Sequence, residues 1–204
     1  MSVRTGVVVL ALGLSLGLSG CGRDGDVVAP APDTRTDRSA PVTLPEGVAA
    51  VATAEPGAIR NRWEAQTELS RTVTGNLTAS LEAGRGGPLV LAFANGITMR
   101  LERVADQLGA DRTGSANVTF SSTLGADPNA QVFIYRVADE RLADSASRGG
   151  LCQGGRTAHV ALSEFVNRQG DWVFTLAAYR GSVQPGPGAS ADPQFCAAYG
   201  YGVS

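Results

Sequence analysis

The sequence contains no lysine, and all 17 of its basic residues are arginines, so Schiff-base chemistry on a lysine amine is excluded. A single histidine, His159, is too little for a histidine-based metal site. The formal net charge of −2 gives no sign of the strongly basic face that nucleic-acid binding requires. The glycine-rich runs lack the strand-and-helix context of phosphate loops. We therefore expect no metal, no cofactor and no nucleic-acid partner.

The first twenty residues have the pattern of an export signal. Arg4 supplies one positive charge, and residues 6–18 form an uncharged apolar run of thirteen residues. That run is too short for a helix that spans the roughly 30 Å hydrocarbon core of a bilayer, and it suits the central part of a secretory signal. The motif Leu18-Ser19-Gly20-Cys21 follows directly and resembles the lipobox of bacterial lipoproteins.

This resemblance implies cleavage before Cys21 and attachment of two or three acyl chains to that cysteine. Two or more chains anchor a protein stably, because each buried methylene contributes about 0.8 kcal/mol. The next residue is Gly22 rather than the aspartate that tends to retain such proteins at the inner membrane. The resemblance thus implies a lipid-anchored protein of the outer membrane, with its folded part facing the periplasm.

Residues 21–60 are expected to form a tether. The segment after Cys21 holds five of the ten prolines and shows no clear period of two or 3.6 residues, which is typical of a linker. As a random coil it would reach about 35 Å, and fully extended about 120 Å. The folded domain is therefore expected to cover residues 61–204.

The pattern of this domain predicts an all-β fold. Residues 72–81 alternate between apolar and polar side chains, as in a half-buried strand. Within residues 89–101, a three-residue loop ending at Gly96 would place Leu89 opposite Leu101 and Leu91 opposite Met99. Further strands are predicted at 117–124, 130–137, 157–165, 172–180 and 195–203, with a short helix or a turn at 139–147.

This spacing favours a single antiparallel barrel or a sandwich of about eight strands. A barrel of that size encloses side chains or one small ligand. The same region contains Cys152 and Cys196, and we expect them to form a disulfide because exported proteins fold in an oxidising compartment.

Candidate functional residues are few. Trp172, Phe174, Tyr199 and Tyr201 enrich the C-terminal end in aromatics, which indicates either core packing or a surface for a ligand or partner. His159 could serve as a catalytic base, but the sequence places no nucleophile beside it.

Three functions are compatible with these features. The first is a non-enzymatic module that binds an envelope component or a small apolar ligand. The second is an accessory that binds another envelope protein, and the third, least favoured, is a hydrolase that uses His159. A deep apolar lumen would favour the first, a filled core with an exposed apolar patch the second, and a cleft with a hydroxyl beside His159 the third.

Overall fold

A computed structural model describes residues 55–84, 87–146 and 148–203. The predicted signal peptide, the lipobox, Cys21 and most of the predicted tether lie outside these residues. Within the described part, no helix is long and apolar enough to cross a membrane.

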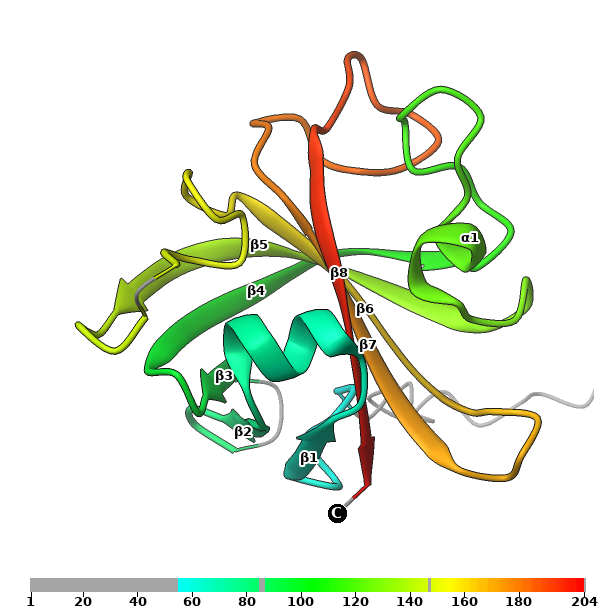
Figure 1. Ribbon diagram of the computed structural model, residues 1–204. Coiled ribbons are helices and arrows are strands. Elements are labelled where there is room, and N and C mark those ends of the chain that lie inside the picture. Colours follow the sequence, from blue (N-terminus) through cyan, green and yellow to red (C-terminus); the bar gives the residue numbers. More distant parts are fainter. Residues whose placement is uncertain (1–54, 85–86, 147, 204) are drawn as a thin grey trace, which may run out of the picture. The chain divides into compact units, whose positions relative to one another are not determined.

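The chain forms a closed barrel of eight strands in which each strand pairs antiparallel with the next and β8 pairs with β1 (Figure 1). The structure thus confirms the all-β prediction and decides for a barrel over a sandwich. The strands are β1 (Arg62–Ala65), β2 (Leu77–Leu81), β3 (Leu89–Phe93), β4 (Ile97–Leu108), β5 (Gln131–Leu142), β6 (His159–Val166), β7 (Trp172–Tyr179) and β8 (Phe195–Val203).

The register predicted for the β3–β4 hairpin is confirmed. Leu89 pairs with Leu101 and Leu91 with Met99, and all four side chains are buried. Gly96 has a φ of 92°, in the left-handed region that glycine tolerates best. Here the local sequence alone determined the pairing.

Two predicted strands are wrong in whole or in part. Residues Ser70–Thr74 form a short helix, η1, and the strand predicted from residue 72 begins only at Leu77. This helix crosses one end of the barrel, since the Ser70 hydroxyl donates to the carbonyl of Gly200 and the backbone N–H of Asn95 donates to the carbonyl of Thr74 (Figure 1).

Residues 117–124, also predicted as a strand, contain the one-turn helix α1 (Phe120–Leu124). Thr119 caps it by accepting from the backbone N–H of Ser122, whose side chain accepts in return from the backbone N–H of Thr119. The region 139–147 begins as strand, because β5 continues to Leu142 before the chain turns.

Side chains fill the interior of the barrel. One buried cluster collects alternate residues of the strands, which face inward because strand side chains alternate between the two faces of the sheet. Its largest fully buried members include Trp63, Leu77, Leu91, Met99, Tyr135, Phe174, Tyr199 and Tyr201. The interior is therefore a packed core.

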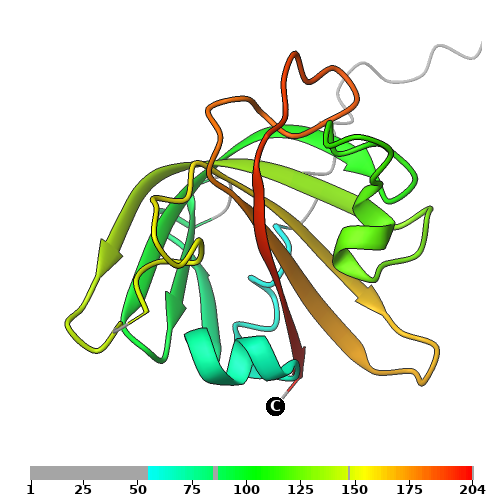
Figure 2. The same cartoon turned by 45° about the horizontal axis from the view of Figure 1, so that its top comes forward.

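The segment before β1 closes the end of the barrel opposite η1. Gly57 is buried, and a Cβ atom there would lie 3.0 Å from the ring of Phe174. Its N–H donates to Glu164 at 2.7 Å, and its carbonyl accepts from the indole of Trp63 at 3.1 Å. Figure 2 shows this segment in cyan. Residues 55–60, assigned to the tether by the sequence prediction, thus pack against the barrel.

A second buried cluster lies on the outside of the barrel. Phe120 and Leu124 of α1 pack against outward-facing residues of β5, β6 and β7, among them Ala161 and Ala177. Cys152 and Cys196 form a disulfide, as predicted, and it ties the loop after β5 to the start of β8. Helix α1 and this outer face of the sheet position the sites described below.

Candidate functional site

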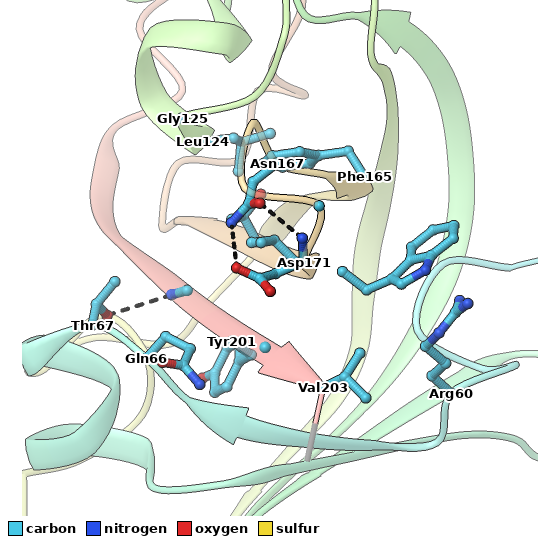
Figure 3. A pocket seen from close by; sticks show the side chains of 16 residues that line it. Arg60, Gln66, Thr67, Leu124, Gly125, Phe165, Asn167, Asp171, Tyr201 and Val203 are labelled. Carbon is cyan, nitrogen blue, oxygen red and sulfur yellow. Dashed lines mark hydrogen bonds between the residues drawn. The ribbon is translucent and has the colours of Figure 1, made fainter.

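A groove of about 800 Å³ lies on the outer face of β7 and β8 (Figure 3). We call it the β7–β8 groove. Thr175, Gly200 and Gly202 line it from the two strands, and Leu124 and Gly125 line it from the end of α1. The remaining wall comes from the β6–β7 hairpin, from the connection between β1 and η1, and from Arg60, which precedes β1.

Glycines allow the β1–η1 connection to lie close to β8. A Cβ atom at Gly200 would come within 2.9 Å of Thr67, and one at Gly202 within 3.0 Å of Gln66. The inward neighbours of these glycines, Tyr199 and Tyr201, belong to the core. The outer face of β8 is therefore bare of side chains along the groove.

Thr175 carries an unsatisfied hydroxyl. The residue is buried, and its Oγ1 atom has no hydrogen-bond partner among the described residues. A buried polar group without a partner costs about 1–3 kcal/mol. In Thr74, by contrast, the buried hydroxyl lies 3.0 Å from the carbonyl of Ser70 and 2.8 Å from the hydroxyl of Tyr201.

Trp172 stands at the mouth of the groove with 38% of its surface exposed. The guanidinium carbon of Arg60 lies 3.7 Å from the centre of its ring, within the range of a cation–π contact. The same guanidinium donates to Glu164 at 3.1 Å. Trp172 and Arg60 are therefore held together at the end of the barrel that the segment before β1 closes.

The β6–β7 hairpin that carries Trp172 has an ordered loop. The side-chain oxygen of Asn167 accepts from the backbone N–H groups of Gln169 and Asp171, each at 2.9 Å. This side-chain-to-backbone bonding is a common way to stabilise a turn. It fixes the chain immediately before Trp172.

Three exposed apolar residues belong to the segments that meet at Trp172, and together with Trp172 we call them the apolar rim. Val166 pairs with Trp172 across the hairpin, Val203 lines the same groove, and Ile59 precedes Arg60. Their exposed fractions are 49%, 45% and 74%, respectively.

The four aromatic residues predicted as a ligand or partner surface do not form one surface. Phe174, Tyr199 and Tyr201 are buried in the core at 0–1% exposure, and only Trp172 is exposed. Trp172 and Phe174 share a face of β7, but Trp172 is the first residue of the strand and lies beyond the packed core.

The sequence-based prediction missed Thr175, Gln66 and the two glycines. Only the alternation of glycine and tyrosine in residues 199–202 could have signalled a bare face.

His159 stands at the start of β6, and its ring has one hydrogen-bond partner among the described residues. Its ring is buried, and Nδ1 lies 3.3 Å from the carbonyl oxygen of Gly181. Burial lowers the pKa of His159, and the charge of Arg136 adds to this effect against the hydrogen bond to Gly181. No hydroxyl of a described residue lies within hydrogen-bond distance of the ring. In the same residues no group of three or more His, Cys, Asp or Glu side chains is placed to hold a metal ion.

The chain matches no known protein family, and no curated protein or solved structure is significantly similar to it. Its function is therefore inferred from the geometry of the chain itself.

Proposed function

We propose that this protein is a lipid-anchored accessory of the bacterial cell envelope that binds another envelope protein through the apolar rim and the β7–β8 groove. The observation that carries the proposal is the exposed Trp172, held under Arg60 beside the groove. The resemblance of residues 18–21 to a lipobox supports the anchor. The disulfide between Cys152 and Cys196 fits an oxidising compartment.

The filled interior argues against a carrier that holds a small apolar ligand in its lumen. Such a ligand would have to displace residues such as Leu91, Met99 and Phe174, which are fully buried. Truncation of such side chains to alanine typically costs about 2–5 kcal/mol each, which indicates how much their packing contributes to stability. A binding site on the outside of the barrel requires no such rearrangement.

A protein partner accounts for the composition of the rim. Tryptophan and arginine are, with tyrosine, the residues most enriched among those that dominate binding energy in protein interfaces. Ile59, Val166 and Val203 provide apolar surface around them, as expected for a contact that excludes water. The tether would let the domain reach about 35 Å as a coil, enough to meet a partner away from its own anchor.

Photo-crosslinking in the intact envelope tests this proposal. A photoreactive amino acid is placed at Ile59 or Val203 in the rim, or at Leu142 as a control. Leu142 is 51% exposed. Because β5 and β7 run in the same direction, Leu142 at the end of β5 lies at the opposite end of the barrel from Trp172 at the start of β7. We expect one discrete protein adduct from the rim positions, absent from the control position and lost when Trp172→Ala is added.

Either of two measurements could contradict the proposal. Adducts that are the same at Leu142 as in the rim, or that persist in the Trp172→Ala variant, would show that the rim is not the binding surface. A native mass spectrum of protein gently extracted from its envelope provides the second check. A small-molecule mass lost on denaturation, with no protein partner, would restore the carrier hypothesis.

A further inference from the structure

A second pocket, of about 570 Å³, lies on the other side of α1 from the β7–β8 groove. Ser122 and Thr123 of α1 line this pocket, whereas Leu124 and Gly125 line the groove. Its other walls come from the loop before α1, the end of β7 and the start of β8. None of its lining residues takes part in the proposed protein contact, so it requires a separate explanation.

The pocket is lined by a buried tyrosine whose hydroxyl has no partner. Tyr179 is 0% exposed, and its Oη atom makes no hydrogen bond to any described residue. The other three tyrosines all have partners: Tyr135 donates to Glu55, Tyr199 donates to the carbonyl of Leu151, and Tyr201 bonds to Thr74. A phenylalanine would fill the same space without the cost of about 1–3 kcal/mol that an unsatisfied hydroxyl carries.

Hydroxyl groups form much of the remaining wall, and each of them already donates its proton to a hydrogen bond within the protein. Thr113 donates to the carbonyl of Val118, and Ser115 donates to Asp192 at 2.7 Å. Ser122 and Thr123 both donate to the carbonyl of Thr119, at 2.8 and 3.0 Å. A hydroxyl has one proton and two lone pairs. The oxygens of Ser122 and Thr113 also accept hydrogen bonds, from Thr119 and Ser115 respectively. Ser115 and Thr123 are therefore the hydroxyls that offer oxygen acceptors to the pocket.

Two charged side chains of opposite sign lie in the same wall. The hydrogen bond from Ser115, and then the one from the backbone N–H of Gln194, lower the pKa of Asp192, which is thus ionised at neutral pH. Arg180 gives its Nε–H to Gln194 at 3.3 Å, and its guanidinium has further N–H donors. Because the two charges offset each other, the pocket favours a ligand without net charge.

Phe195 supplies an apolar platform. It is 47% exposed, and its ring packs edge-on against that of Tyr179, with 5.8 Å between the ring centres. An exposed aromatic ring beside a set of polar groups suits a ligand that has both C–H faces and hydroxyl groups.

We propose that this pocket binds a neutral saccharide unit, with the Tyr179 hydroxyl donating to a sugar oxygen and the C–H face of the ring lying on Phe195. Sugar hydroxyls both donate and accept, so they match the acceptors of Ser115, Thr123 and Asp192 together with the donors of Tyr179 and Arg180. The volume lies within the range of small-molecule sites.

Calorimetric titration of the full chain tests this site. The probes are N-acetylglucosamine, its disaccharide N,N′-diacetylchitobiose, and maltose, with choline as a cationic probe for the alternative that Phe195 and Asp192 attract an ammonium group. We expect at least one saccharide to bind at millimolar concentration and choline not to bind. Loss of one uncharged hydrogen bond in Tyr179→Phe should weaken the affinity by about 2–12-fold, the equivalent of 0.5–1.5 kcal/mol.

Two matched variants make the result specific. Tyr201→Phe removes a tyrosine hydroxyl from the core, and it should leave the saccharide affinity unchanged. Phe195→Ala should abolish measurable binding, and because Phe195 is half exposed the variant should still fold. The proposal is overturned if no saccharide binds, if choline alone binds, or if Tyr179→Phe and Tyr201→Phe have the same effect on affinity.

Discussion

The hydroxyl of Tyr201 lies 2.8 Å from the hydroxyl of Thr74, and this contact joins the last strand of the barrel to the helix that crosses one of its ends. Both residues are fully buried. The same helix is tied to β8 a second time, because the Ser70 hydroxyl donates to the carbonyl of Gly200 and accepts from its N–H. The closure of this end therefore depends on hydroxyl groups as well as on apolar packing.

Removing the two buried tyrosine hydroxyls should have different effects on stability. Tyr201→Phe should lower the free energy of unfolding by about 1 kcal/mol, because a satisfied buried hydrogen bond is lost. Tyr179→Phe should leave that free energy unchanged or raise it, because its hydroxyl has no partner among the described residues. Urea denaturation of both variants measures the difference. Equal losses in the two variants would show that the Tyr179 hydroxyl is hydrogen-bonded in the folded protein.

The disulfide should contribute strongly to stability. Cys152 and Cys196 are 44 residues apart, and closing a loop of that size stabilises the folded state by up to about 4 kcal/mol. Changing both cysteines to serine should lower the denaturation midpoint accordingly, while Cys21→Ser, before the barrel in sequence, should leave it unchanged. A thiol titration of the denatured, unreduced mature protein should find no free thiol, and two titratable thiols would contradict the pairing.

Glu164 should hold the segment before β1 in place. Its side chain is 13% exposed, and it accepts from the N–H of Gly57 and from Arg60. Glu164→Ala should cost about 2–3 kcal/mol, because it leaves a buried N–H and an arginine without their acceptor. Glu102→Ala is the control: its ion pairs with Arg100 and Arg136 are more exposed, so it should cost at most about 1 kcal/mol.

Limited trypsin digestion provides an independent measure of this release. The chain has no lysine, so trypsin cleaves it only after arginine. We expect faster cleavage after Arg60 in Glu164→Ala than in the wild type or in Glu102→Ala. An unchanged rate after Arg60 would mean that Glu164 does not restrain the segment.

His159 should make stability depend on pH. Burial lowers its pKa in the folded state below the ordinary value of 6.5. Between these two pKa values the unfolded chain binds more protons than the folded protein, so acidification favours unfolding. The contribution of neutral His159 is complete above pH 6.5 and is lost as the pH falls toward the folded-state pKa. Thermal unfolding across mildly acid pH should show this decline in the wild type and a flatter profile in His159→Gln. A parallel decline in both would assign it to other groups.

Parts of the fold could be read directly from the sequence. The β3–β4 hairpin has its apolar residues at alternate positions on both sides of Asn95 and Gly96, so only one register buries Leu89, Met99 and Leu101 together. The strand Phe195–Val203 was predicted with the bounds that the structure gives. In the hairpin, neighbours in sequence supply the decisive contacts, whereas Phe195–Val203 pairs with the more distant β1 and β7.

The two misassigned segments fail for a common physical reason. Residues 70–74 and 120–124 are short, rich in serine and threonine, and suited to more than one local conformation. The first becomes helical because Ser70 and Thr74 bond to β8, more than 120 residues away in sequence. The second does so because Phe120 and Leu124 pack on the outer face of β6 and β7. Neither contact is visible in a local pattern.

Local sequence and tertiary contacts also contribute differently to the candidate sites. The sequence by itself determined an all-β chain, the register of its clearest hairpin and the pairing of its two later cysteines, because these follow from local alternation and from residue type. Only the tertiary structure decided that the barrel closes and that its interior is filled. It also left the hydroxyls of Thr175 and Tyr179 without partners among the described residues, on either side of α1. Pockets of this kind arise where distant segments meet, and a linear pattern does not record which segments those are.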